Sequence, residues 1–155
     1  MRRKRKFTRE ILPDPKYGNV AIAKFINHVM RRGKKSTAQK VFYTAMDLIE
    51  KKHQQDAMNI FDTAIRNVSP LLEVKSRRIG GATYQVPREV RGERKFFLAS
   101  NWILNAARAG KGKPMHEKLA GELLLAAKNE GNAIKKRMDT HRMADANKAF
   151  AHFSW

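Results

Sequence analysis

Residues Ser36 to Pro70 read STAQKVFYTAMDLIEKKHQQDAMNIFDTAIRNVSP, and this stretch decides the fold. Apolar residues recur in it at intervals of three and four, which predicts two amphipathic helices. Ser36 and Gln39 have the spacing of a capping box, so we expect the first helix to begin there, and Pro70 follows the last apolar position of the second. The stretch contains four acidic and four basic residues, so its net charge is zero. These two neutral helices are the predicted core.

The rest of the chain is strongly basic. The whole protein has 155 residues and a net charge of +19, and the entire surplus lies outside residues 36–70. A surplus of this size repels itself in isolation and suits a polyanionic partner. We therefore expect a nucleic acid as the partner, with an anionic membrane surface as the lesser alternative.

Length and composition fit one folded domain spanning residues 1–155. Apolar residues make up 42% of the chain, which is enough for a buried core. The chain contains no cysteine, which excludes disulfides and zinc sites with thiolate ligands. The first residues lack the apolar stretch of a secretory signal, and no apolar run approaches the roughly 18 residues of a membrane span. We expect a soluble, cytoplasmic protein.

The predicted fold class is mainly α, with six helices and one β-hairpin. A basic arm (residues 1–10) precedes a proline-containing loop, and the hairpin occupies residues 73–88, around a turn at Gly80-Gly81. The helices outside the core stretch are expected around residues 22–30, 93–109, 119–127 and 133–149.

Two of these elements are expected to face phosphate. Lys75, Arg77 and Arg78 put cations on both faces of the first hairpin strand, which a buried strand would not tolerate, so the hairpin should protrude. The last helix is mostly polar, with Ile134 and Met138 as its expected anchors. Beyond it we expect Phe150 to pack on the protein, whereas Phe153 and Trp155 could pack or stack on bases.

No residue pattern indicates catalysis. Gly33-Lys34-Lys35 resembles a phosphate-binding loop, but His28 and Lys35 occupy the positions that would need a glycine and a hydroxyl. There is no nucleophile elbow, and the spacing of the five histidines is not that of a metal site. We predict no catalytic residue, no metal, no cofactor and no small-molecule substrate.

Composition alone does not separate DNA from RNA. A DNA-binding protein that reads a groove with one helix is the main alternative, and an enzyme acting on RNA is the other. The cations, however, are spread over an arm, two loops, a hairpin and a terminal helix. That distribution suits an irregular RNA surface better than one groove.

Four motifs then make the chain recognisable. It closely resembles the family of ribosomal protein seven of the bacterial small subunit, over almost its full length. The motifs are LPDPKYG (12–18), GKKS (33–36), VKSRRIGGATYQVP (74–87) and HRMADANKAFAH (141–152).

The resemblance implies a six-helix domain with a hairpin after the third helix, in a structural constituent of the small ribosomal subunit rather than an enzyme. Family members are primary binders of small-subunit ribosomal RNA that nucleate folding of the head. They lie near the exit-site transfer RNA and the messenger path, and they contact small-subunit proteins nine and eleven. Many bacterial members also repress translation of their own messenger. The implied location is a bacterial ribosome in the cytoplasm, with a plastid-encoded copy as the alternative.

The predicted contacts follow from the basic segments and from this resemblance. Those to ribosomal RNA are Arg2, Arg3, Lys4, Arg5, Lys6, Lys34, Lys35, Lys75, Arg94, Lys111, Lys113, Lys135, Lys136, Arg137 and Arg142. Those of the hairpin tip, near transfer RNA and messenger, are Arg77, Arg78, Gly80, Gly81 and Tyr84.

Overall fold

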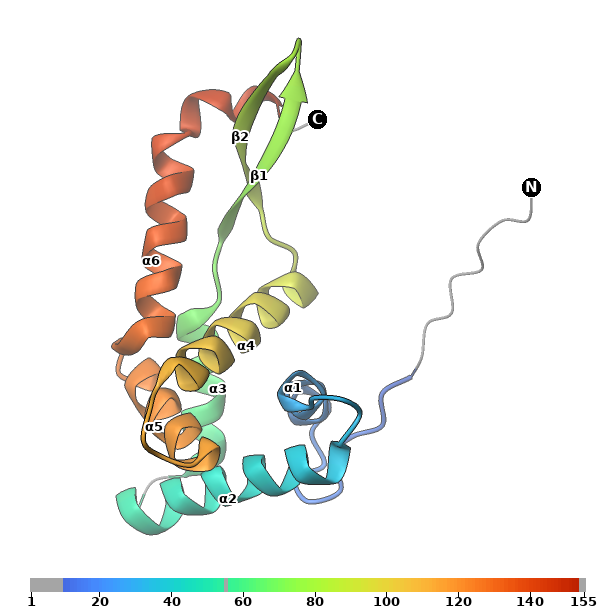
Figure 1. Cartoon of the computed structure of the whole chain (residues 1–155), viewed down its shortest axis with the longest axis vertical. Helices are drawn as coiled ribbons and strands as arrows, with labels where there is room; N and C mark the ends of the chain where they lie inside the picture. Colours follow the sequence, from blue (N-terminus) through green and yellow to red (C-terminus); the bar gives the residue numbers. More distant parts are fainter. Residues whose placement is uncertain (1–9, 55, 154–155) are drawn as a thin grey trace, which may run out of the picture. The chain divides into compact units, whose positions relative to one another are not determined.

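Six α-helices, one 3-10 helix and one two-stranded hairpin form the described part of the chain (Figure 1). The computed structural model describes residues 10–54 and 56–153. The hairpin lies between the third and fourth helices, which confirms the predicted fold class. The predicted arm contacts Arg2 to Lys6, and the terminal Trp155, lie outside the described residues.

The described residues form two compact units, divided after Lys40. In the first unit, buried Asp14 organises the predicted loop, because its carboxylate accepts hydrogen bonds from the backbone N–H groups of Lys16 and Tyr17 at 3.1 and 3.2 Å. Helix α1 (Val20–Val29) follows, and the Asn19 side chain caps it by accepting from the N–H of Ala21 at 2.7 Å.

Helix α2 (Lys35–His53) begins one residue before the predicted start. Ser36 therefore lies inside the helix, and the predicted capping box is wrong. The turn ahead of it already closes through the backbone, with the N–H of Lys35 donating to the carbonyl of Gly33 at 2.9 Å. From Val41 onward α2 belongs to the second unit, where Phe42, Ala45 and Ile49 are fully buried and Val41 and Leu48 are half-buried.

Helix α3 (Ala57–Val68) ends just before Pro70, as predicted, and Asp56 caps its start by accepting from the N–H of Met58 at 2.9 Å. Phe61 of α3 meets Phe42 edge to face at 5.7 Å between ring centroids. Both rings are completely buried, so the two neutral helices contribute to the core as predicted. Helices α4 (Gly92–Ala109), α5 (Met115–Ala127) and α6 (Gly131–Ala146) complete it, with α5 packed against α3 and α4.

Asn67 joins three helices at the end of α3. Its side-chain amide donates to the carbonyls of Ala126 and Ala127, at 3.0 and 2.9 Å, and so satisfies the end of α5. Its own backbone carbonyl accepts a hydrogen bond from the guanidinium of Arg137 on α6. One residue therefore holds α3, α5 and α6 together.

The start of α6 is fixed by a carboxylate from α5. Glu122 is buried, and its Oε1 accepts from the backbone N–H of Ala133 at 2.9 Å, near the positive end of the helix. Gly131 has a φ of +92°, and a Cβ placed there would lie 3.0 Å from Glu122 Oε1 and 3.1 Å from the Leu125 Cβ. Glycine is therefore required at the corner between α5 and α6.

The hairpin consists of β1 (Leu72–Ile79) and β2 (Ala82–Glu89), joined by Gly80 and Gly81 with φ values of +56° and +90°. Both strand bounds and turn follow the prediction closely. The root of the hairpin is anchored to the helices, since Nε2 of His141 on α6 accepts from the N–H of Leu71 at 3.1 Å.

The C-terminal segment differs from the prediction. Helix α6 ends at Ala146 rather than near Ala149, and a separate 3-10 helix, η1 (Lys148–Phe153), follows. Ile134 is buried as expected, but Met138 is 55% exposed, so its predicted role as an anchor is wrong. The small side chains of Ala133, Thr140 and Ala144 face the protein instead.

Replacing Asn67 with alanine should lower the free energy of unfolding by about 1–2 kcal/mol, because two carbonyls at the end of α5 lose their donor. Urea denaturation measures this change. Thr63→Ala, at an exposed position one turn earlier on α3, is the control and should change stability by less than about 0.5 kcal/mol. Equal stabilities of the two variants would show that Asn67 does not join the helices.

Candidate nucleic-acid interface

The strand register sorts the cations of the hairpin by face. Lys75 pairs with Val86 and Arg77 with Tyr84, so these four residues share one face, whereas Arg78 pairs with Thr83 on the other. Lys75 and Arg78 are exposed, and Arg77 is half-buried. The prediction of cations on both faces is confirmed, and Arg78 is the exposed arginine of the face opposite Tyr84.

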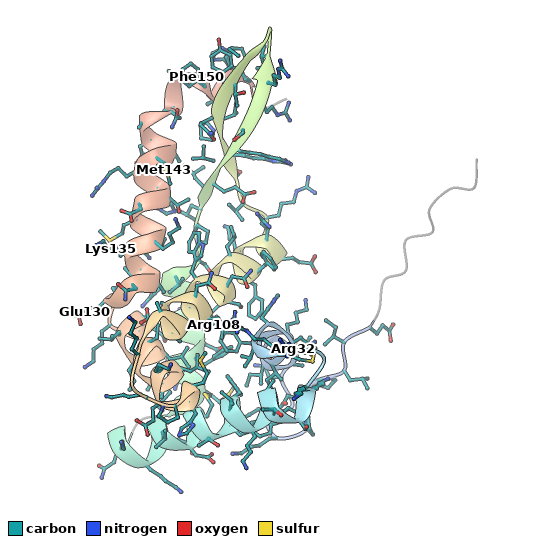
Figure 2. All side chains as sticks on the ribbon, in the orientation of Figure 1. Arg32, Arg108, Glu130, Lys135, Met143 and Phe150 are labelled. Carbon is teal, nitrogen blue, oxygen red and sulfur yellow. The ribbon has the colours of Figure 1, made fainter. Side chains whose placement is uncertain are left out.

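Helix α6 carries the second set of predicted cations. Lys135, Lys136 and Arg142 are exposed, and Figure 2 shows where Lys135 lies on this helix. Arg137 is different because it is half-buried and its guanidinium donates to the Asn67 carbonyl. The fold thus uses Arg137 internally and leaves the other three at the surface.

Arg94, near the start of α4, is also engaged within the protein. Its Nη2 lies 3.1 Å from a carboxylate oxygen of Glu73 on β1, in an ion pair, and its Nε donates to the same oxygen at 3.2 Å. The guanidinium also lies 5.2 Å from the ring centroid of Phe97. Its charge is therefore partly neutralised in the folded chain, and it links α4 to the hairpin.

Between the hairpin root and the end of α6 lies an open groove of about 770 Å³. Arg88, Arg91 and Lys148 contribute to its lining, together with the acidic Glu89 and Asp145. None of these three cations was among the predicted contacts. They come from β2, the β2–α4 connection and η1, so no local pattern in the sequence brings them together.

The remaining predicted cations lie elsewhere. Lys111 and Lys113 are exposed in the loop between α4 and α5. Lys113 and Lys52 of α2 border a small cavity of about 140 Å³, at the end of the second unit away from the hairpin (Figure 1). Lys34, in the turn before α2, and Lys35, the first residue of α2, are exposed in the first unit. Lys52 and Lys113 therefore lie apart from the cations that line the groove.

His28, in the last turn of α1, is near this turn in sequence but adds no charge to it at neutral pH. Burial lowers the pKa of His28 below its ordinary value of 6.5, because the charged imidazolium loses solvation. The positive charge of this part of the chain comes from the exposed residues that follow, Arg31, Arg32, Lys34 and Lys35.

Two kinds of site do not occur among the described residues. Histidine and acidic side chains form no group of three or more that could hold a metal ion. None of the described helices is both long and apolar enough to cross a membrane.

The described part of the chain is a helical scaffold with a cationic hairpin and exposed cations on its last α-helix, and nothing in it marks a catalytic site. The family model described as ribosomal protein S7p/S5e matches residues 1–148, and the chain belongs to this family. It is thus a structural constituent of the small ribosomal subunit and not an enzyme, as predicted.

Individual relatives agree over nearly the whole chain. The protein named small ribosomal subunit protein uS7 of Thermotoga petrophila is 57% identical over 155 residues, which cover 100% of both chains. The protein of the same name from Syntrophobacter fumaroxidans is 59% identical over 147 residues, covering 95% of this chain and 94% of the relative. That of Teredinibacter turnerae is 57% identical over 145 residues, covering 94% and 93%. These bacterial relatives confirm the predicted location in the ribosome, and hence in the cytoplasm.

The pKa of His28 predicts a pH dependence of stability. Because the folded pKa lies below 6.5, the unfolded chain takes up the proton more readily. The stability that this group contributes is complete above pH 6.5 and is lost as the pH falls through the folded pKa. Urea denaturation between pH 7.5 and 5 should show a smaller loss for His28→Gln than for the unmodified chain.

Asn27→Gln is the control for this experiment, because it changes a half-buried neighbour without changing any ionisable group. It should keep the pH dependence of the unmodified chain. An unchanged pH dependence in His28→Gln would show that burial of this imidazole does not contribute.

Proposed function

We propose that the chain is a primary binder of small-subunit ribosomal RNA and that it nucleates folding of the head of the subunit. On this proposal residues 1–155 act as one RNA-binding domain. The arm at Arg2 to Lys6, the turn at Lys34 and Lys35, and the basic face of α6 hold the RNA.

One observation carries the proposal: exposed cations from distant segments gather at the hairpin end of the second unit. Lys75 of β1 and Arg142 of α6 are exposed, and Arg88, Arg91 and Lys148 line the groove between the hairpin root and the end of α6. Cations gathered from a hairpin and several connections suit several phosphates of a folded RNA. A reader of one DNA groove would instead present a single helix.

The mechanism we propose is neutralisation of RNA phosphates with release of their counterions. The packed scaffold of α2 and α3 keeps the cations in position, so that little ordering of the protein is needed on binding. Phosphate contacts of this kind position the protein on the RNA, while the shape of the junction supplies selectivity.

The remaining parts of the proposal concern neighbours. The hairpin tip from Arg77 to Tyr84 would approach the exit-site transfer RNA and the messenger path. Small-subunit proteins nine and eleven would contact the chain in the assembled head. Binding of the same basic surface to the protein's own messenger would repress its translation. The family resemblance supports these parts, and the exposed position of Arg78 is consistent with the role of the tip.

Binding to a head-junction RNA should weaken steeply with salt. Each neutralised phosphate contributes roughly 0.7–0.9 to the slope of log K against log salt concentration, so several contacts should give a slope of several units. Filter binding over a salt series measures the slope, with duplex DNA of equal length as competitor. A nearly flat slope would contradict the mechanism, and equal binding to the DNA would mean that charge alone acts.

Lys75→Gln should weaken binding to this RNA and reduce the salt slope by about one, because Lys75 is exposed on β1 and one phosphate contact is lost. Arg66→Gln is the matched control, since Arg66 is exposed on the neutral helix α3 and the substitution removes the same charge. The control should keep the slope of the unmodified chain. An equal loss in both variants would show that net charge, not the hairpin, determines affinity.

A further inference from the structure

The outer half of the hairpin needs a support that its root does not supply. At the root, His141 accepts from the N–H of Leu71, the N–H of Val90 donates to the carbonyl of Leu71 at 3.0 Å, and Val86 is 2% exposed. Beyond Val86 the strands run outward to the exposed Gly80-Gly81 turn. Isolated two-stranded hairpins are marginally stable in water, so the tip depends on other contacts for its order.

Such contacts come from the 3-10 helix η1. The ring of Tyr84 on β2 lies 5.3 Å from that of Phe150 and 5.5 Å from that of Phe153, between centroids. Phe150 and Phe153 lie 6.5 Å apart with an angle of 13° between their planes, and His152 lies 4.0 Å from Phe153. Figure 2 shows Phe150 beside the hairpin. We call Tyr84, Phe150 and Phe153 the aromatic cluster.

The other end of η1 is attached to α6. Nδ2 of Asn147 donates to the carbonyl of Met143 at 2.8 Å, and the backbone N–H of Asn147 donates to the same carbonyl at 3.2 Å. The N–H of Phe150 then donates to the carbonyl of Asn147 at 3.0 Å. The link between α6 and η1 is thus set by hydrogen bonds, and it brings Phe150 to the strand that carries Tyr84.

We infer that η1 is a latch: its aromatic cluster holds the outer half of the hairpin in one orientation and so presents the hairpin cations to RNA. Tyr84 pairs with Arg77, and Arg78 is the next residue, on the opposite face. Fixing Tyr84 therefore fixes the strand segment that carries both arginines. Phe150 and Phe153 are positioning residues in this account, since they act through the hairpin.

The latch would raise RNA affinity by preorganisation, because a hairpin already held in place loses less conformational freedom on binding. The number of phosphate contacts would stay the same. The inference about affinity rests on the proposed RNA-binding function, whereas the inference about hairpin order does not. The two parts therefore need separate measurements.

The test is the double variant Phe150→Ala with Phe153→Ala in the full chain. Hydrogen exchange of the free protein, followed by mass spectrometry, should show amides of residues 76–85 exchanging about tenfold faster or more, while α3 and α5 keep their protection. RNA affinity should fall by roughly three- to tenfold with an unchanged salt slope. The conservative pair Phe150→Tyr with Phe153→Tyr should restore both properties.

Met138→Ala with Met143→Ala is the matched control, because both are exposed apolar side chains of α6 outside the aromatic cluster. It should leave hairpin exchange unchanged. Tyr84→Ala removes the partner ring from the hairpin side and should reproduce the faster exchange.

Unchanged hairpin exchange in the double alanine variant would overturn the latch, as would faster exchange spread equally over α3 and α5. Faster hairpin exchange with full RNA affinity would overturn the role in binding. If the unmodified chain fails to bind the RNA, the proposed function fails, but the exchange experiment still decides the latch.

Discussion

The fold depends on the hydrogen bonds that Asn67, at the end of α3, makes with α5 and α6. Its amide satisfies the end of α5, and its carbonyl receives Arg137 of α6. One turn further along α6, His141 accepts from the backbone of Leu71, where the chain enters the hairpin. Helix α6 therefore holds both ends of the connection from α3 to β1. A carbonyl or N–H group left without a partner at such a junction would cost free energy, so these bonds define how the hairpin leaves the core.

The chain has a net charge of +19, and some of its few acidic side chains form contacts within the fold. Several carboxylates serve internal structure: Asp14 organises a turn, Asp56 caps α3, Glu122 holds the start of α6, and Glu73 pairs with Arg94. The exposed cations of the hairpin and α6 remain at the surface, where they can face a polyanion, and the groove between them is bordered by both signs of charge.

Local patterns predicted the elements well where one strong physical cause acts. Two successive glycines at positive φ produce the predicted turn, and the regular apolar spacing of residues 57–68 produces α3, the second of the two predicted core helices. The predictions from sequence failed where the local pattern of residues was weaker. The predicted helix start at Ser36 was wrong because the backbone closes the turn one residue earlier. The predicted burial of Met138 was wrong because, beyond Ile134, the inner face of α6 is formed by the smaller side chains of Thr140 and Ala144.

By itself, the sequence determined the helices, the hairpin, the neutral core and the family, because periodicity, turn residues and motifs are local properties of the chain. Only the tertiary structure decided which cations are engaged within the protein and which remain at the surface to bind a polyanion. Arg94 forms an ion pair with Glu73, and Arg137 donates a hydrogen bond to the carbonyl of Asn67. Arg88, Arg91 and Lys148 line one groove. These outcomes depend on neighbours that are distant in sequence, since burial and ion pairing are set by contacts that exist only after the helices have packed.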